Sequence, residues 1–297
     1  MPDNQQNHIV KKYGQSLEIR AFSEYAKRGL DEYERNAFDQ IIKKDDAVLD
    51  LGCGAGREAK AIAGQCSKVY ALDLVPGMLR TARGFAGETN VYFMRADATS
   101  LPVRSSSVDV VLMAKQFMNH ITGSQQRTVT MSEAYRVLKP GGRIYLTVHN
   151  NLFNIGIVHL LNNLYKMIHA GPAPNKPAQP GGSGTSGADL SSLLAGFFFL
   201  KPRSIAVNAY RRLMSKINKG YNGKEAGDWE ISHVSDALSP YTSPYHNYTV
   251  HELSALARSA GFRIDEIKDT WELARGKTLP KFLRNGAYTV AFILKKD

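Results

Sequence analysis

A buried strand that runs directly into a glycine-rich turn constrains this chain more than any other feature of its sequence. Residues 47–51 form the strand, with Asp50 near its end, and Gly52, Gly54 and Gly56 follow at once. Glycine lets the backbone turn tightly and lets a ligand approach it closely. Helix-forming residues come next. A strand, a glycine turn and a helix in this order predict a nucleotide-binding turn in an α/β fold.

Apolar strands alternate with helices through the first half of the chain. Such alternation indicates a parallel sheet with right-handed crossovers, because each helix must return the chain to the same edge of the sheet. Pro76 suits the first turn of one of these helices. We expect helices at residues 17–42, 57–63, 76 onward and 124–138, and strands at residues 47–51, 68–73, 91–96, 108–113, 143–148, 262–267 and 288–294.

The alternation stops between residues 151 and 248, which we expect to form an insertion that recognises the substrate. Residues 1–150 and 249–297 then make up the binding domain, with an N-terminal helical lid. Thr249 and Glu252 form a capping-box pattern that restarts regular structure. Within the insertion we expect a mainly helical arrangement: a helix at 152–168, a flexible loop at 171–187, a helix at 190–219 and irregular structure at 221–248.

Bulk composition indicates an ordinary globular protein. Of the 297 residues, 43% are hydrophobic and 22% are charged, which argues against wholesale disorder. The apolar run at 193–200 is too short to span a bilayer, and residues 1–12 lack a signal-peptide core. Cys53 and Cys66 allow one disulfide at most, which does not suggest a secreted disulfide scaffold. We therefore expect a cytoplasmic protein without an integral membrane segment.

The net charge of +11 bears on partners and not on fold. Anionic small molecules, RNA and an anionic membrane surface would all be attracted to it. Part of the excess is a basic run without acidic residues between 199 and 224; a solvated helix face is the other reading of this run. Its members are Lys201, Arg203, Arg211, Arg212, Lys216, Lys219 and Lys224.

Two further acids narrow the choice of nucleotide. Asp73 lies 21 residues after Gly52, at the end of the second strand, where a carboxylate can accept hydrogen bonds from both ribose hydroxyls. Asp97 ends the third strand, where an adenine amino group needs an acceptor. The glycine spacing is one residue shorter than in the dinucleotide fingerprint, and S-adenosylmethionine (SAM) has no pyrophosphate to place on a helix N-terminus. The pattern therefore favours SAM over NAD.

These motifs resemble those of the class I SAM-dependent methyltransferases, in the branch that includes the ubiquinone, menaquinone and many small-molecule enzymes. The resemblance covers roughly residues 13–150 and 249–297. It implies a Rossmann-like, doubly wound, mostly parallel seven-stranded sheet whose last strand is antiparallel. The similar segments are 48–56 (VLDLGCGAG), 71–78 (ALDLVPGM), 96–102 (ADATSLP) and 136–142 (RVLKPGG).

The resemblance also implies which residues hold the cofactor. Asp73 and Leu74 would hold ribose and adenine, Asp97 and Ala98 the adenine edge, and the glycine turn the methionine part. Arg57 would either meet the SAM carboxylate or lie in solvent on its helix. The whole set implied for SAM, or for S-adenosylhomocysteine as product, is Asp50, Gly52, Gly54, Gly56, Arg57, Asp73, Leu74, Met78, Asp97, Ala98, Lys115, Gln116 and Phe117.

Methyl transfer needs alignment, exclusion of water and, for some acceptors, a base. His120 follows the fourth strand and is the candidate base, or else a packed histidine leading away from the site. The candidate acceptor-facing residues come from the lid, the end of the fifth strand and the end of the insertion: Tyr13, Tyr25, His149, Asn150, Tyr245, His246 and Tyr248.

The sequence lacks the residues that several kinds of methyl-acceptor chemistry require. Residues 114–117 read AKQF, unlike the Asn/Asp-Pro-Pro-Tyr/Phe segment of adenine amino-methylation, and neither cysteine is placed for attack on cytosine. We find no metal-ligand spacing. The leading hypothesis is methylation of O, N or C in a small organic acceptor, anionic or aromatic. A tRNA wobble-uridine carboxymethyl methyltransferase and a non-catalytic SAM-binding protein are the alternatives. The sequence leaves the oligomeric state open.

Overall fold

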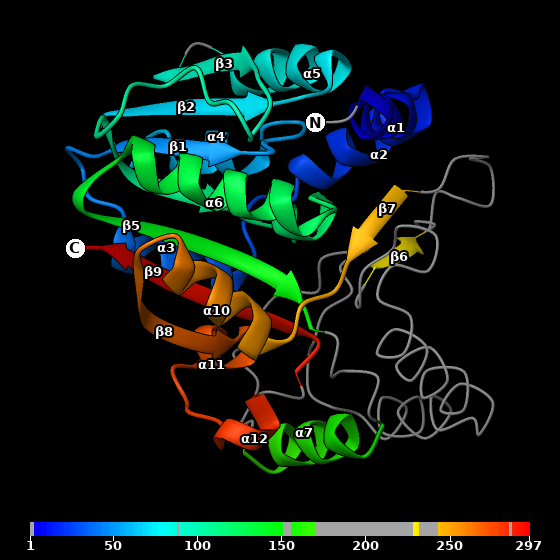
Figure 1. Ribbon diagram of the computed structural model, residues 1–297, viewed down its shortest axis with the longest axis vertical. Helices are drawn as coiled ribbons and strands as arrows, with labels where there is room; N and C mark the ends of the chain where they lie inside the picture. The colour runs from blue at the N-terminus through cyan, green and yellow to red at the C-terminus, as the bar shows by residue number, and fades with distance from the viewer. Residues whose placement is uncertain (1–2, 88, 151–155, 170–227, 232–242, 285–286) are drawn as a thin grey trace.

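The computed structural model describes residues 3–87, 89–150, 156–169, 228–231, 243–284 and 287–297. Its main feature is a seven-stranded sheet in the order β3-β2-β1-β4-β5-β9-β8 (Figure 1). The strands are β1 Ala47–Leu51, β2 Lys68–Asp73, β3 Val91–Arg95, β4 Val108–Met113, β5 Leu138–His149, β8 Phe262–Asp269 and β9 Thr289–Lys296.

Strands β1 to β5 pair in parallel, and β9 is antiparallel to both of its neighbours, β5 and β8. The expected fold class, a doubly wound Rossmann-like sheet with an antiparallel last strand, is confirmed. Strand β5 begins earlier than expected, because Leu138 already pairs with Val108 before a register shift brings Arg143 beside Val110.

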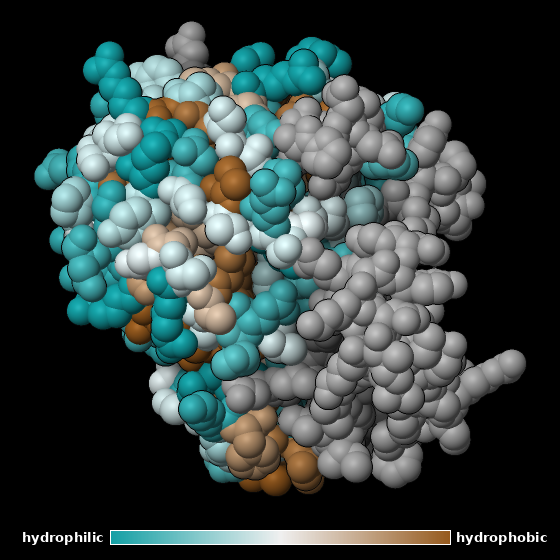
Figure 2. Space-filling model, in the orientation of Figure 1, coloured by the Kyte–Doolittle hydropathy of each residue, from teal (hydrophilic) through white to brown (hydrophobic). Residues whose placement is uncertain are grey.

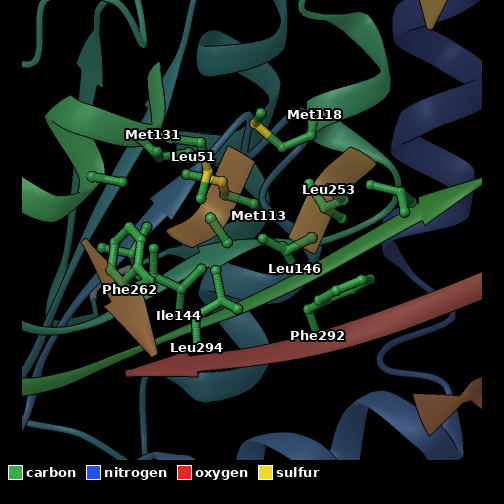
Figure 3. Packing of buried hydrophobic residues seen from close by; sticks show 14 of the residues in the cluster. Leu51, Met113, Met118, Met131, Ile144, Leu146, Leu253, Phe262, Phe292 and Leu294 are labelled. Carbon is green, nitrogen blue, oxygen red and sulfur yellow. The ribbon is translucent and has the colours of Figure 1, made fainter. Parts of the chain in front are cut away.

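Helices cover both faces of the sheet and bury one apolar cluster on each. On one face, α6 (Ser124–Val137) and α10 (Val250–Ser259) pack Met131 and Leu253 against Leu146 and Phe292 (Figure 3). On the other face, α3 (Glu32–Ile41), α4 (Arg57–Ile62), α5 (Pro76–Ala86) and α11 (Thr270–Arg275) supply Phe38, Ile62, Leu79 and Leu273. A short α12 (Lys281–Arg284) precedes β9. The central strands of the sheet are therefore buried on both sides, as their apolar residues predict.

The N-terminal lid differs from the single helix expected at 17–42. Instead α1 (Asp3–Tyr13), α2 (Ser16–Ala26) and α3 are separate helices. The chain turns at Gly29, whose φ of +71° is left-handed. Asp31 then caps α3 by a reciprocal capping box with Glu34. The bend brings α1 and α2 beside the carboxyl ends of the strands (Figure 1).

Three short elements of the insertion belong to the described residues. Helix α7 (Gly156–His169) agrees with the expected helix at 152–168. The expectation of irregular structure at 221–248 is wrong in part, because β6 (Asp228–Ile231) and β7 (Ser243–His246) form an antiparallel pair. The expected loop at 171–187, the helix at 190–219 and the basic run lie outside the described residues. The division into a binding domain and a recognition insertion stays a prediction.

Among the described helices, none has the length and apolar character needed to cross a bilayer.

Candidate functional site

A cavity of about 860 Å³ opens at the carboxyl ends of β1, β2 and β4, with α1 and α2 over it. Open α/β sheets bind their ligands at this edge. Seventeen of the residues singled out from the sequence line the cavity: Tyr13, Tyr25, Asp50, Gly52, Gly54, Arg57, Asp73, Leu74, Met78, Asp97, Ala98, Lys115, Gln116, Phe117, His120, His149 and Tyr245.

The three glycines of the turn have different structural roles. A Cβ on Gly52 would lie 2.3 Å from the Phe117 ring, so this glycine allows the first turn of η1 (Phe117–His120) to pack on β1. Gly54 lines the cavity with a φ of +51°. Gly56 does not line it: a Cβ there would meet Ala82 of α5 at 3.0 Å. Gly56 therefore packs α4 against α5, and its contact with the cofactor stays a prediction.

The backbone holds Asp73 in position at the cavity wall. Its Oδ2 accepts the amide hydrogen of Gly54 at 2.9 Å, and its Oδ1 accepts that of Val75 at 2.8 Å. Burial raises the pKa of Asp73, and these backbone hydrogen bonds oppose that shift. Asp97 is held in a similar way, because its Oδ1 accepts the amide hydrogen of Thr99 at 2.9 Å. Each carboxylate keeps lone pairs for a ligand.

Asp50 is a deeply buried acid of the cavity wall, with 2% of its surface exposed. Within the described part of the chain, its buried Oδ2 has no hydrogen-bond partner. Burial, and then the charge of Glu58, raises the pKa of Asp50 well above its ordinary value. A buried acceptor left unsatisfied costs free energy, so this position suits a ligand that brings a donor or a positive charge.

Arg57 lies buried, not in solvent, which excludes one of its two sequence interpretations. Its Nη2 lies 2.6 Å from Glu34 and 2.5 Å from Glu58, and its Nη1 donates to the Gly29 carbonyl at 2.8 Å. Only 4% of the residue is exposed. Burial would lower its pKa, but the charges of Glu58 and Glu34 raise it. Arg57 thus ties the bend between α2 and α3 to the glycine-turn helix.

Lys115 forms a second set of contacts between the cavity wall and the segment that follows the lid helices. Its Nζ lies 2.5 Å from Asp31 and donates to the Tyr33 hydroxyl at 2.7 Å. The Tyr25 ring lies between the two cations, 4.9 Å from the Arg57 guanidinium and 5.5 Å from Lys115. These contacts hold Tyr25 at the cavity wall. The pairing of Lys115 with Asp31 and Tyr33, and that of Arg57 with Glu34, could not be predicted from a local motif, because the partners are remote in the chain.

Aromatic and imidazole side chains gather at the lid side of the cavity. The Tyr245 hydroxyl lies 2.8 Å from Nδ1 of His149, and the Tyr13 hydroxyl lies 3.5 Å from Nδ1 of His120. The His120 ring meets the rings of Tyr13 and Tyr245 edge-on, at centroid distances of 5.5 and 4.9 Å. Four elements from distant parts of the sequence thus converge: α1, η1, β5 and β7.

His246 is buried away from the cavity, contrary to the expectation that it faces the acceptor. Its Nδ1 lies 2.7 Å from Asp228 of β6, and its Nε2 lies 2.7 Å from Glu252 of α10. Arg127 of α6 approaches Glu252 at 3.9 Å. Burial would lower the pKa of His246, but the hydrogen bonds to Asp228 and Glu252 raise it above its ordinary value. Thr249 caps α10 as expected, while Glu252 binds His246. We call this the His246 clamp.

Asn150 and Tyr248 also lie outside the cavity lining, so the expectation that they face the acceptor is corrected too. The Tyr248 hydroxyl donates to the Met118 carbonyl at 3.1 Å, and the residue is fully buried. The backbone N–H of Asn150 donates to the Tyr288 carbonyl at 2.8 Å. Asn150 and Tyr248 also form a β-bridge, which joins the end of β5 to the chain that leads into α10. The alternation of polar and aromatic residues at 244–248 could not show which side chains point outward.

Comparison with known proteins identifies the domain. Residues 49–146 match the family described as "Methyltransferase domain". The chain carries a class I SAM-dependent methyltransferase domain. The matched residues contain the glycine turn, Asp73, Asp97 and the segment that follows β4, so the methyltransferase domain holds most of the cavity's cofactor side.

Curated relatives and a solved structure agree with this assignment. A demethylmenaquinone methyltransferase of Clavibacter sepedonicus is 37% identical over 34% of this chain and 40% of its own length. A carboxy-S-adenosyl-L-methionine synthase of Pectobacterium atrosepticum is 27% identical over 43% of this chain and 53% of its own length. The chain thus spans about half the length of these relatives. A SAM-dependent methyltransferase from Methanosarcina mazei shares the fold, with a TM-score of 0.54, 19% identity and coverage of 88% of this chain and 96% of its own.

The site also fits the cofactor of this family on its own geometry. The unsatisfied Oδ2 of Asp50 suits the ammonium of a methionine moiety, and Asp73 and Asp97 present acceptors for hydroxyl and amino donors. Among the described residues, no cluster of three or more His, Cys, Asp or Glu side chains could hold a metal ion. Cys53 and Cys66 are both buried free thiols.

Proposed function

We propose that this chain transfers the methyl group of SAM to a small organic acceptor bound beside Tyr245 and His149. The observation that carries the proposal is a single cavity lined by both groups of residues: the acids of the methyltransferase motifs and the tyrosine and histidine cluster. Its volume of about 860 Å³ lies near the upper end of the range for ligand pockets, roughly 300–1,000 Å³. This supports room for a cofactor and a small acceptor together.

Bound SAM supplies a methyl group already activated on a sulfonium. The protein then has to hold and align the reactants. In this proposal Asp50 holds the ammonium, Asp73 the ribose hydroxyls and Asp97 the adenine amino group. Phe117, packed on Gly52, fixes the backbone that follows β4. The lid helices α1 and α2 exclude water, and Arg57 and Lys115 keep the α2–α3 bend in place.

Tyr245 and His149 supply a route for the proton of the acceptor. Burial raises the pKa of the Tyr245 phenol far above its ordinary value, so it stays protonated and can donate to Nδ1 of His149. As the acceptor atom is methylated, its proton passes to the Tyr245 oxygen while the Tyr245 proton passes to His149. His149 then carries the proton as an imidazolium.

Tyr288 stabilises that imidazolium and connects it to solvent. Its ring stacks on His149 with centroids 4.2 Å apart, and 49% of Tyr288 is exposed. An aromatic face attracts a cation at such a distance. The proposal therefore favours acceptors that lose a proton on methylation, such as a phenol or another ionisable hydroxyl. His120, edge-on to Tyr13 and Tyr245, forms a wall of the acceptor space.

The test is methyl transfer from SAM labelled on its methyl carbon to a panel of phenols, carboxylic acids and amines. We expect label in at least one proton-bearing acceptor, lost in the Tyr245→Phe variant and retained in Tyr92→Phe, whose exposed ring lies on β3. Labelled products from tRNA alone would support the RNA alternative instead. SAM binding without transfer to any acceptor or tRNA would support the non-catalytic alternative.

The basic run that motivates the RNA alternative lies outside the described residues. Titration with tRNA at roughly 50 and 200 mM salt tests it, because phosphate contacts make affinity fall steeply with salt. We expect weak binding that Arg211→Ala and Arg212→Ala leave unchanged. Micromolar binding with a steep salt slope would instead favour RNA.

A further inference from the structure

Exposed apolar side chains concentrate on two neighbouring helices at one end of the molecule. In the described part of the chain, eight large hydrophobic side chains are exposed, and four of them lie on α7 and α12. These are Leu161, Leu164, Ile168 and Phe282, and the last two are 67% and 61% exposed. Figure 2 shows apolar atoms at this lower end of the molecule, where Figure 1 places the two helices. Concentrated apolar surface of this kind marks an interaction site.

The spacing on α7 puts its three exposed side chains on one side of the helix. Leu161, Leu164 and Ile168 are three and four residues apart, which is the repeat of a helical face. The other side of α7 holds the helix to the domain. There Asn162 donates to the Leu283 carbonyl at 2.8 Å, and Lys166 binds Asp269 at 2.8 Å. The apolar side is therefore turned away from the contacts that anchor the helix.

The charges around this apolar face are basic. Lys277 and Lys281 are exposed, and Lys277 donates to the His169 carbonyl at the end of α7. Residues 156–169 contain no acidic residue. Two buried carboxylates form salt bridges with these helices. Asp269 pairs with Lys166 of α7, and Glu272 pairs with Arg284 of α12. An approaching anionic surface would therefore meet lysines and few exposed carboxylates.

We infer that the exposed side of α7, with Phe282 of α12, docks on an anionic lipid membrane. A helix that lies in the bilayer interface buries apolar side chains among the acyl chains and keeps basic residues at the headgroups. Each Lys or Arg near an anionic surface strengthens the attachment. The described charges match this partner better than a second copy of the chain, because two copies would bring like charges together. The inference does not depend on the proposed methyl transfer.

Co-sedimentation of the full chain with lipid vesicles tests the inference. The vesicles contain phosphatidylcholine alone or with about one third phosphatidylglycerol, near 0.1 M salt, where charge attraction is not fully screened. We expect binding to the anionic vesicles and weaker binding to the neutral ones. The double variant Ile168→Asp with Phe282→Asp should bind at least tenfold more weakly. The matched control is Tyr92→Asp, which changes a side chain 56% exposed on β3 and should bind like the wild type.

A second variant distinguishes the contribution of charge to vesicle binding from that of apolar contact. Lys277→Ala with Lys281→Ala leaves the apolar face intact and should weaken binding to anionic vesicles by about tenfold or more. All variants should keep wild-type SAM affinity by calorimetry, which checks their fold independently of catalysis. Absence of wild-type binding to anionic vesicles, or equal binding by the Ile168→Asp/Phe282→Asp variant, would overturn the inference. So would a change of oligomeric state in that variant without any vesicle binding by the wild type.

Discussion

The Tyr245 hydroxyl lies 2.8 Å from Nδ1 of His149, which joins the β6–β7 pair to the carboxyl end of β5. Both residues line the cavity, and the His246 clamp next to Tyr245 fixes β7 against α10. Strand β7 thus contributes a side chain to the same cavity as the methyltransferase motifs. This relationship underlies the proposed proton route.

Removing the phenol should slow methyl transfer more than it weakens binding. We expect Tyr245→Phe and His149→Gln each to lower kcat by roughly 10²- to 10⁴-fold, the usual contribution of a positioned base, with a much smaller change in KM. The loss should shrink for more acidic acceptors, which need less help to lose a proton. Steady-state kinetics across a series of substituted phenols measures this. An equal loss for every acceptor would indicate that the pair only shapes the cavity.

SAM affinity should depend on pH through Asp50. Burial, with the charge of Glu58, raises the pKa of Asp50, and a cationic ligand favours its ionised form. SAM binding should therefore release a proton and weaken as pH falls through the raised pKa. Asp50→Asn should weaken binding by about 1–3 kcal/mol at neutral pH and flatten the pH dependence. Calorimetry in buffers of different ionisation enthalpy measures the proton release, and its absence in the wild type would contradict the assignment.

The His246 clamp should make stability depend on pH in a defined direction. Because the pKa of His246 is raised in the folded state, its contribution is complete below the unfolded value of about 6.5. The contribution is lost as pH rises through the folded pKa. His246→Gln should lower the free energy of unfolding by about 1–3 kcal/mol at pH 6 and by less at pH 9. Urea unfolding at both values measures it, and an equal loss at each pH would rule out a charged clamp.

Alanine substitutions at two glycines with similar φ angles distinguish the cost of steric contact from the cost of backbone strain. Gly52 and Gly141 have φ values of +73° and +78°. A Cβ on Gly52 would lie 2.3 Å from Phe117, while one on Gly141 would meet nothing within 4 Å. Both Ala substitutions should cost about 1 kcal/mol for the left-handed backbone, and Gly52→Ala about 1–3 kcal/mol more for overpacking. Thermal unfolding of both variants measures the difference. Equal costs would show that Phe117 moves freely.

The fold and the cofactor side of the cavity could be predicted from sequence because their signals are local. Each motif acid comes at a strand end, and parallel strands bring those ends to one edge of the sheet. Asp50, Asp73 and Asp97 accordingly line one cavity. For Gly56 the glycine spacing alone does not distinguish a ligand contact from close packing on a neighbouring helix, and only the structure shows Ala82 beside it.

The acceptor side depends on contacts between distant residues, which no local pattern reveals. Tyr245, His246 and Tyr248 look alike as candidates, yet alternation along β7 and the chain beyond it sends only Tyr245 into the cavity. His246 instead finds Asp228 and Glu252. The break between α2 and α3 has a different, local cause: Gly29 and the cap at Asp31 interrupt an apolar stripe that continues across them and predicts one helix.

The most direct test is the affinity of the chain for SAM in variants of Asp73 and Asp97, the acids proposed to hold its ribose and adenine. We predict that Asp73→Asn and Asp97→Asn each weaken SAM binding by about 1–3 kcal/mol, roughly 5- to 150-fold, because each leaves ligand donors unpaired. Asp265→Asn, which changes an acid paired with Arg263 on β8, should bind like the wild type. Isothermal titration calorimetry measures all four proteins. Wild-type affinity in both Asp73→Asn and Asp97→Asn would contradict the placement of SAM in this cavity.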